Sequence, residues 1–214
     1  MSTPPEHIDL TSWIHEQLKS QILEHKLKPG QKIVQEEIAE ELGVSRTPLL
    51  KVLQILESEF LVESIPRRGY YVREISTKEM IDVFECREVL EGLAARLVAE
   101  KAEDSDLESI KNCFVPFIES NEPIEEKEYE KADQQFHSLI SQLCDNKMLS
   151  RLEMIGNVHI LAYQKGLLRP PEETLPEHKK IIQALLNRNA DEAEKAMRIH
   201  IRRSRESLKI KLNN

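Results

Sequence analysis

Apolar residues recur with helical spacing through the first part of the chain. From Leu10 to Ile22 they lie four residues apart, which places them on one face of a helix. A second apolar face runs through residues 35–42, and a third runs from Leu49 to Leu56. The pattern predicts three short amphipathic helices.

The residues between the second and third helices favour a tight turn. Gly43 can adopt a positive φ at little cost. Ser45 is a good N-cap for the third helix. Pro48 falls in the first turn of that helix, where a missing N–H is harmless. We therefore expect a helix-turn-helix.

Two strand-like runs follow at residues 61–65 and 70–75, and the turn sequence at 66–69 separates them. Helices followed by such a hairpin are typical of a winged helix-turn-helix. Beyond the second run only helical patterns occur. The change predicts two domains, a winged helix-turn-helix over residues 1–75 and a helical domain over residues 76–214.

The second domain shows six amphipathic helical patterns. They lie near residues 77–102, 104–120, 124–144, 147–167, 174–187 and 191–211. A bundle is the natural way to bury six apolar faces. The predicted fold is thus mostly α, with a small β-hairpin in the first domain and an all-α bundle in the second.

Composition agrees with a folded, helix-rich protein, since hydrophobic residues make up 40% of the chain and there are only six glycines. No apolar run is long enough to cross a bilayer, and the N-terminus carries no secretory signal. Cys86, Cys113 and Cys144 lie far apart, so we interpret them as reduced, buried residues. These observations predict a cytoplasmic protein.

The net charge of −8 argues against a surface that coats nucleic acid uniformly. Even residues 1–75 hold more Asp and Glu than Lys and Arg. Any DNA binding must therefore use a local basic cluster, and its affinity should depend steeply on salt.

The start of the third helix is the first candidate for contact with double-stranded DNA. Ser45, Arg46 and Thr47 lie at its N-terminus, where the helix dipole and free N–H groups favour phosphate. Arg46 suits a guanine edge or a phosphate. Lys51, one turn further on, can add a phosphate contact.

The hairpin tip is the second candidate. Arg67 and Arg68 suit the negative potential of a minor groove, and Gly69 lets the backbone approach closely. The alternative is a small domain whose exposed arginines are merely solvated.

A candidate metal site comes from three of the later helices. Asp133 and His137 lie four residues apart, on one helix face. His178 and His200 lie beside the apolar stripes of two further helices. Three imidazoles and one carboxylate can bind a divalent ion such as Zn²⁺, Ni²⁺, Mn²⁺ or Fe²⁺ and leave positions open. A lone helical histidine is, however, more often a surface or hydrogen-bonded residue than a ligand.

Residues 8–73 resemble the GntR family of transcription regulators. The matching segments include Leu27-Lys28-Pro29-Gly30, Ile38-Ala39-Glu40-Glu41-Leu42-Gly43-Val44-Ser45-Arg46-Thr47-Pro48 and Pro66-Arg67-Arg68-Gly69-Tyr70-Tyr71-Val72. The resemblance implies that Arg46 contacts the operator and that Arg68-Gly69 forms the wing. The chain departs from the family pattern at Leu50, where a second arginine is usual, and at Phe60, where a glycine is usual.

Residues 77–205 look like the FCD effector domain of FadR-type GntR regulators, in the six-helix, VanR-like version. The matching segments are Arg87-Glu88-Val89-Leu90-Glu91-Gly92-Leu93-Ala94-Ala95-Arg96-Leu97, Asp133 to His137, Asn146, Glu177-His178 and Asp191 to His200. The resemblance implies a homodimer. It also implies a metal held by Asp133, His137, His178 and His200, and an effector carboxylate held by Arg87.

We therefore expect a DNA-binding regulator whose affinity for a two-fold-symmetric operator responds to a small organic acid at a metal site, zinc first among the metals. One alternative is a metal-dependent enzyme that acts on a small organic acid. Against it, the sequence shows no nucleophile motif and no glycine-rich phosphate loop. Another alternative is a DNA-binding dimer without a ligand.

Overall fold

The computed structural model describes residues 9–120, 122–149, 151 and 166–213. The described residues form two compact units, one that ends at Ile75 and one that begins at Ser76. Each unit has its own helices and its own buried residues.

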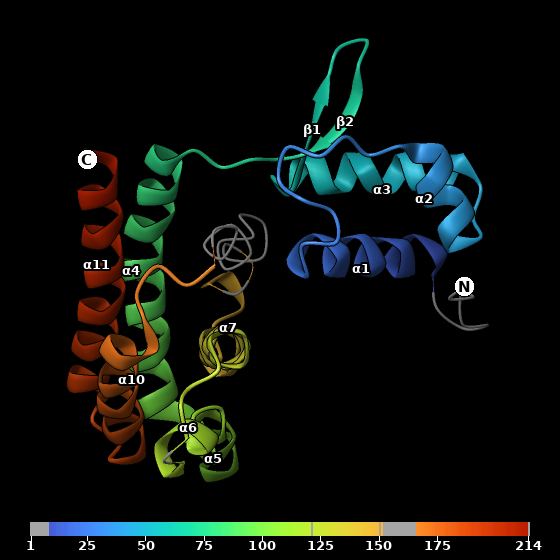
Figure 1. Cartoon of the computed structure of the whole chain (residues 1–214). Helices are drawn as coiled ribbons and strands as arrows, with labels where there is room; N and C mark the ends of the chain where they lie inside the picture. The colour runs from blue at the N-terminus through green and yellow to red at the C-terminus, as the bar shows by residue number, and fades with distance from the viewer. Residues whose placement is uncertain (1–8, 121, 150, 152–165, 214) are drawn as a thin grey trace. The chain divides into compact units, whose positions relative to one another are not determined.

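The first unit holds three helices and a two-stranded sheet (Figure 1). Its elements are α1 (Leu10–Leu23), α2 (Gln35–Leu42), α3 (Arg46–Ser58), β1 (Val62–Ile65) and β2 (Gly69–Val72). The strands are antiparallel, and their register runs from the pair Val62 and Val72 to the pair Ile65 and Gly69. The order of elements is that of a winged helix-turn-helix.

The apolar stripes of α1 and α3 face each other in the core of this unit. Ile14 and Leu18 on α1 are fully buried, as are Leu49 and Leu53 on α3. Val72 of β2 belongs to the same core. The four-residue spacing that predicts these helices thus places their apolar side chains on the packed face.

The second unit is all helical (Figure 1). Its elements are α4 (Thr77–Lys101), α5 (Asp104–Asn112), α6 (Val115–Glu119), α7 (Glu126–Leu143), α10 (Pro171–Leu186) and α11 (Ala190–Asn213). α4 and α11 lie side by side along much of their lengths, while α7 packs on α4 and α10 packs on α11. The mostly α fold with one small hairpin is therefore confirmed.

Two details of the predicted elements were wrong. The single helix expected over 104–120 is broken between α5 and α6, where Pro116 cannot continue the hydrogen-bonding of the preceding turn. The helix expected from 174 begins at Pro171, since proline is well tolerated at the first helical position. Most of the helix expected over 147–167 lies outside the described residues.

The cysteine prediction was wrong at one position. Cys113 and Cys144 are buried and Cys86 is exposed, and all three are free thiols. Cys86 lies on the solvent side of α4, one residue before a buried arginine, and its burial could not be deduced from residue type. None of the helices in the described part of the chain combines the length and apolar character needed to cross a membrane.

Candidate DNA-binding surface and metal centre

The start of α3 presents exposed side chains on the first unit. Gly43 adopts the expected left-handed conformation, with φ 64°, and turns the chain from α2 into α3. Ser45, Arg46, Thr47 and Lys51 are all exposed. Ser45 occupies the N-cap position, but its side chain makes no capping hydrogen bond. The N-terminus of α3 therefore has the free N–H groups and nearby cations that favour a phosphate.

Arg46 is paired with an acidic residue of α2. Its Nη1 lies 3.0 Å from Oε1 of Glu36, and the two side chains are 63% and 58% exposed. An ion pair this exposed contributes little free energy. Arg46 can therefore exchange Glu36 for a DNA phosphate or a guanine edge at small cost.

The hairpin tip is built around a residue in a strained conformation. The N–H of Arg68 donates to the carbonyl of Ile65 at 2.9 Å, and Arg67 has φ 63°. Proline followed by positive φ is the arrangement of a type II turn, in which glycine usually takes Arg67's place. A non-glycine residue there costs about 1–2 kcal/mol. The backbone is thus strained at Arg67, at a point where Arg67 and Arg68 are both exposed.

The two departures from the GntR pattern are both visible on this unit. Phe60 has φ 61°, the conformation that a glycine adopts most easily, and half of its surface is exposed. The guanidinium of Arg73 lies 5.5 Å from the centre of the Phe60 ring, and this cation–π contact offsets part of the cost of the positive φ at Phe60. Leu50 on α3 is 39% exposed, so it is a surface residue of this helix.

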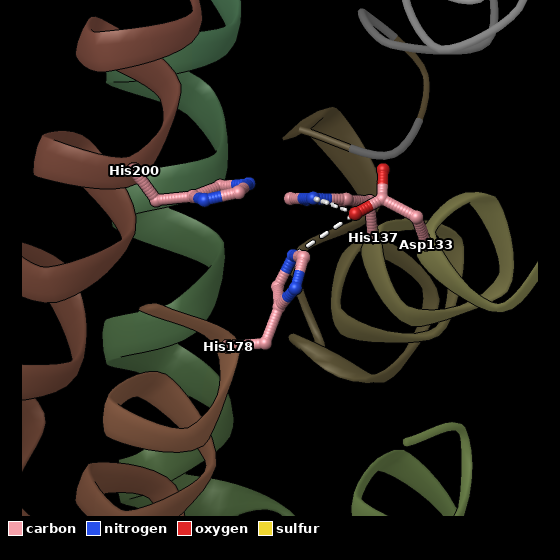
Figure 2. Close-up of side chains that lie close together, drawn as sticks. All are labelled: Asp133, His137, His178 and His200. Carbon is pink, nitrogen blue, oxygen red and sulfur yellow. Dashed lines mark ion pairs between the residues drawn. The ribbon is translucent and has the colours of Figure 1, made fainter. Parts of the chain in front are cut away.

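The second unit brings together Asp133 and His137 of α7, His178 of α10 and His200 of α11. Figure 2 shows the four side chains pointing toward one another from three helices. One potential ligand atom from each lies within 4.8 Å of the others, and all four residues are buried. This group could hold a metal ion.

Each imidazole in the cluster is held at Nδ1 by a side chain outside it. Nδ1 of His137 lies 2.5 Å from a carboxylate oxygen of Glu91, and Nδ1 of His200 lies 2.8 Å from one of Glu177. Nδ1 of His178 lies 2.9 Å from the hydroxyl of Tyr129. A carboxylate accepts the N–H of its histidine and so leaves Nε2 with the lone pair. This is the arrangement that metal-binding histidines need.

Two phenylalanine rings pack against the ring of His178. Phe114 stacks on it with ring centroids 4.2 Å apart, and Phe136 meets it edge-on at 5.1 Å. Phe114 lies in the break between α5 and α6, so the interruption of the predicted helix places this ring against the cluster. The packing restricts His178 to one orientation.

The charge states of the cluster suit a metal ion. Burial lowers the pKa of His137, His178 and His200 below the ordinary value of 6.5, which leaves the imidazoles neutral at pH 7. Burial alone would raise the pKa of Asp133, but the neighbouring imidazoles outweigh it and hold that pKa below its usual range. One carboxylate and three neutral imidazoles form a donor set for a divalent transition metal.

One buried nitrogen atom of the cluster, Nε2 of His178, lacks a hydrogen-bond partner among the described residues. It lies 3.0 Å from Oδ1 of Asp133 without hydrogen-bond geometry. An unsatisfied buried polar atom costs about 1–3 kcal/mol. A metal ion among the four donors would satisfy it, so the residues present fit such an ion.

Arg87 lies on α4, buried beside this cluster. Its Nε donates to Oε1 of Glu91 at 2.5 Å, and its guanidinium lies 4.7 Å from the centre of the Phe84 ring. The second oxygen of Glu91 is the one that contacts His137. The predicted carboxylate-binding arginine and a predicted metal ligand are thus joined through one residue.

The sequence pattern did not indicate a role for Glu91, Tyr129 or Glu177. The sequence could have indicated Glu177, because it directly precedes His178. Glu91 and Tyr129 reach their histidines from other helices, and helix packing alone decides which helices meet. Acidic residues on helices are usually solvated, so nothing in the pattern marked Glu91 as buried.

The three histidines predict a loss of stability on acidification. Each has a lowered pKa in the folded chain, so below about pH 6.5 the unfolded chain binds protons that the folded chain does not. The free energy of unfolding is therefore at its full value above about pH 6.5 and decreases as the pH falls. The cost is up to about 1.4 kcal/mol per pH unit for each histidine that is neutral when folded and protonated when unfolded.

Thermal unfolding of metal-free protein between pH 7.5 and pH 5 measures this effect. Asp133 and Glu177 have lowered pKa values, so their stabilising contributions are lost only at more acidic pH and do not interfere. A melting temperature that is constant over this range would contradict the buried, neutral histidines.

Two family models match the chain, one in each unit. The model of bacterial regulatory proteins of the gntR family matches residues 10–72, and the FCD domain model matches residues 82–203. The second match alone covers more than half of the chain. The family membership expected from the sequence is thereby confirmed.

Individual relatives agree with these matches. The HTH-type transcriptional regulator YdhC of Bacillus subtilis is 27% identical over 91% of this chain and 89% of its own. The Nta operon transcriptional regulator of Aminobacter aminovorans is 28% identical over 84% of this chain and 85% of its own. These relatives are transcriptional regulators, not enzymes.

The fold is also shared with a solved structure. The Escherichia coli protein McbR/YncC superposes with a TM-score of 0.78 over 96% of this chain and 99% of its own, at 21% sequence identity. That likeness concerns the fold. The two family matches and the named relatives show that the chain belongs to the GntR family of bacterial regulatory proteins with an FCD domain, and that it is a DNA-binding transcriptional regulator.

Proposed function

We propose that this regulator senses a small organic acid through a divalent metal ion, and that the acid sets its affinity for the operator. The observation that carries the proposal is the buried cluster of Asp133, His137, His178 and His200. A buried group of polar side chains is costly without a partner. The burial of four such groups on three helices supports a role in binding.

Zinc fits the donor set best. Neutral imidazole and carboxylate are both common zinc ligands, whereas magnesium and calcium prefer oxygen alone. Nickel, manganese and iron also bind imidazole, so they remain alternatives for the experiment to separate. When bound, such an ion supplies a Lewis acid to which a carboxylate can attach.

Arg87 supplies a second contact for an acid. A planar guanidinium pairs with carboxylate through parallel N–H groups, and burial strengthens the attraction. Arg87 is only 3% exposed and is connected to His137 through Glu91. The cluster and Arg87 together favour a small, negatively charged ligand.

α4 is the element through which acid binding can reach the DNA-binding unit. It begins at Thr77, directly after the first unit, and a capping box at Ser76 and Glu79 fixes its start. Arg87 lies ten residues into this helix, about 15 Å along its axis. In the proposed homodimer, a shift of α4 changes the spacing of two DNA-reading units over a two-fold-symmetric operator.

Melting measurements test the proposal. Purified protein is loaded with zinc, mixed with a panel of small mono- and dicarboxylic acids, and heated, with a chelator-treated sample in parallel. A ligand at 100 times its Kd stabilises the folded state by about 2.7 kcal/mol. We expect at least one acid to raise the melting temperature and the chelator to abolish that rise.

Metal analysis of the same sample completes the test. We expect about one divalent ion per chain after loading and dialysis. If zinc does not bind and chelation changes neither stability nor the response to any acid, the sensing proposal fails. The alternative of a DNA-binding dimer without a ligand then takes its place.

A further inference from the structure

One buried carboxylate contacts both halves of the proposed sensing site. Oε1 of Glu91 accepts from Nε of Arg87 at 2.5 Å, and Oε2 of Glu91 lies 2.5 Å from Nδ1 of His137. Glu91 and His137 are each 1% exposed, and Arg87 is 3% exposed. Water therefore screens these interactions very little, and a change in one contact alters the other.

A second buried carboxylate, Glu177, provides an internal comparison. It contacts Nδ1 of His200 at 2.8 Å and is paired with Arg169 and Arg203. It thus resembles Glu91 in holding a histidine and in being neutralised by arginine. It differs in having two arginine partners, neither of which is the one assigned to the acid.

We propose that Glu91 is a positioning residue that couples the two ligands, so that an anion at Arg87 and a metal ion at His137 strengthen each other's binding. This inference rests on the proposed function. It adds that the metal and the acid communicate through a side chain that touches neither. Glu177, by contrast, serves the metal alone.

The coupling follows from how one negative charge is shared. Glu91 partly neutralises the Arg87 guanidinium, which weakens the attraction of that guanidinium for any other anion. An anion on Arg87 takes up part of its positive charge, so Glu91 pulls more strongly on the Nδ1–H of His137. A stronger pull there makes Nε2 a better donor to a metal. Linkage requires the reverse effect to be equally large.

Zinc affinity is the first measurement, made on the full chain by competition with a chromophoric chelator. The variants are Glu91→Gln and Glu177→Gln. Loss of the carboxylate that orients a metal-bound histidine lowers metal affinity by about 10- to 100-fold, and we expect this range for both variants. Wild-type affinity for zinc in Glu91→Gln would overturn the positioning role, provided that the unmodified protein binds zinc.

Acetate binding to the metal-free protein is the second measurement. Glu91→Gln removes the charge that competes for Arg87, so we expect it to bind acetate more tightly than the unmodified protein, by about fivefold or more. Glu177→Gln should bind acetate as the unmodified protein does. A merely structural role for Glu91 would weaken zinc and acetate binding together, and that result would overturn the coupling.

Arg87→Met provides a second route if circular dichroism shows that Glu91→Gln does not fold. It removes the guanidinium from Glu91 and keeps the contact between Glu91 and His137. We expect zinc affinity at or above that of the unmodified protein and no acetate binding without metal. Weakened zinc binding in this variant would overturn the coupling. If the unmodified protein binds no zinc at all, the proposed function itself has failed.

Discussion

Replacing Arg46 by alanine is expected to weaken operator binding by about 30-fold or more. A side chain that pairs with a guanine edge contributes about 1–3 kcal/mol to discrimination. Two copies in the proposed dimer give about 2–6 kcal/mol, and each 1.4 kcal/mol is a factor of ten. Arg46 is 63% exposed, so its removal leaves the core of the unit intact. Fluorescence anisotropy with a labelled operator duplex measures the change.

Lys26→Ala is a matched control for that variant. Lys26 is 67% exposed, lies in the same unit and is also paired with a glutamate, here Glu24. Its replacement removes the same charge from a position outside α3 and the hairpin. We expect a change of threefold or less, on the order of one exposed charge. Equal losses in the two variants would show that total charge, rather than the start of α3, determines binding.

Replacing Asp133 by asparagine is expected to remove most of the affinity for metal. Zinc bound by four protein ligands contributes about 10–16 kcal/mol, so one ligand contributes about 2.5–4 kcal/mol, on the order of 100-fold or more in affinity. The substitution keeps the shape of the side chain. In the unmodified protein, metal at 1,000 times its Kd adds about 4 kcal/mol, or roughly 8–16 °C in melting temperature. At the same metal concentration Asp133→Asn should keep only about 0.5–1.6 kcal/mol of this gain.

Glu128→Gln controls for the loss of a negative charge on the same helix. Glu128 is 61% exposed on α7 and is paired with Lys131 at the surface. This variant should keep both its zinc affinity and its melting shift. A normal zinc-dependent shift in Asp133→Asn would contradict the assignment of the carboxylate to the metal.

The sequence was most informative where structure depends on neighbouring residues. The apolar spacing around Leu18 and Leu53 predicted the helices that pack in the first unit, and Gly43 adopts the positive φ expected of it. The spacing of Asp133 and His137 likewise predicted one helix face. These features follow from periodicity and turn chemistry, which are local properties of the chain.

The sequence was least informative about contacts between helices that are far apart in the chain. The buried partners Glu91 and Tyr129 lie 46 and 49 residues from the histidines they contact. Nothing in a helical pattern specifies which helix of a bundle packs against which. Pro116 causes the break between α5 and α6 locally, but the stacking of Phe114 on His178 could not be predicted for the same reason, because it forms only once α10 is in place.

The conformation of the hairpin tip was predicted only in part from the sequence. Proline and glycine at its ends predicted the turn, but not that Arg67 would adopt a positive φ. Turn type depends on the strand register, and pairing of Ile65 with Gly69 leaves three residues to reverse the chain. The resulting strain falls on an arginine at the tip proposed to contact DNA.

The role of the metal in the response to the acid is tested by operator affinity, measured with and without the stabilising acid, in zinc-loaded protein and in Asp133→Asn. We predict that the acid changes the affinity of the zinc-loaded protein by about 5- to 150-fold and leaves that of the variant unchanged. An operator affinity that does not respond to the acid in zinc-loaded protein, or that responds equally in the variant, would contradict this prediction.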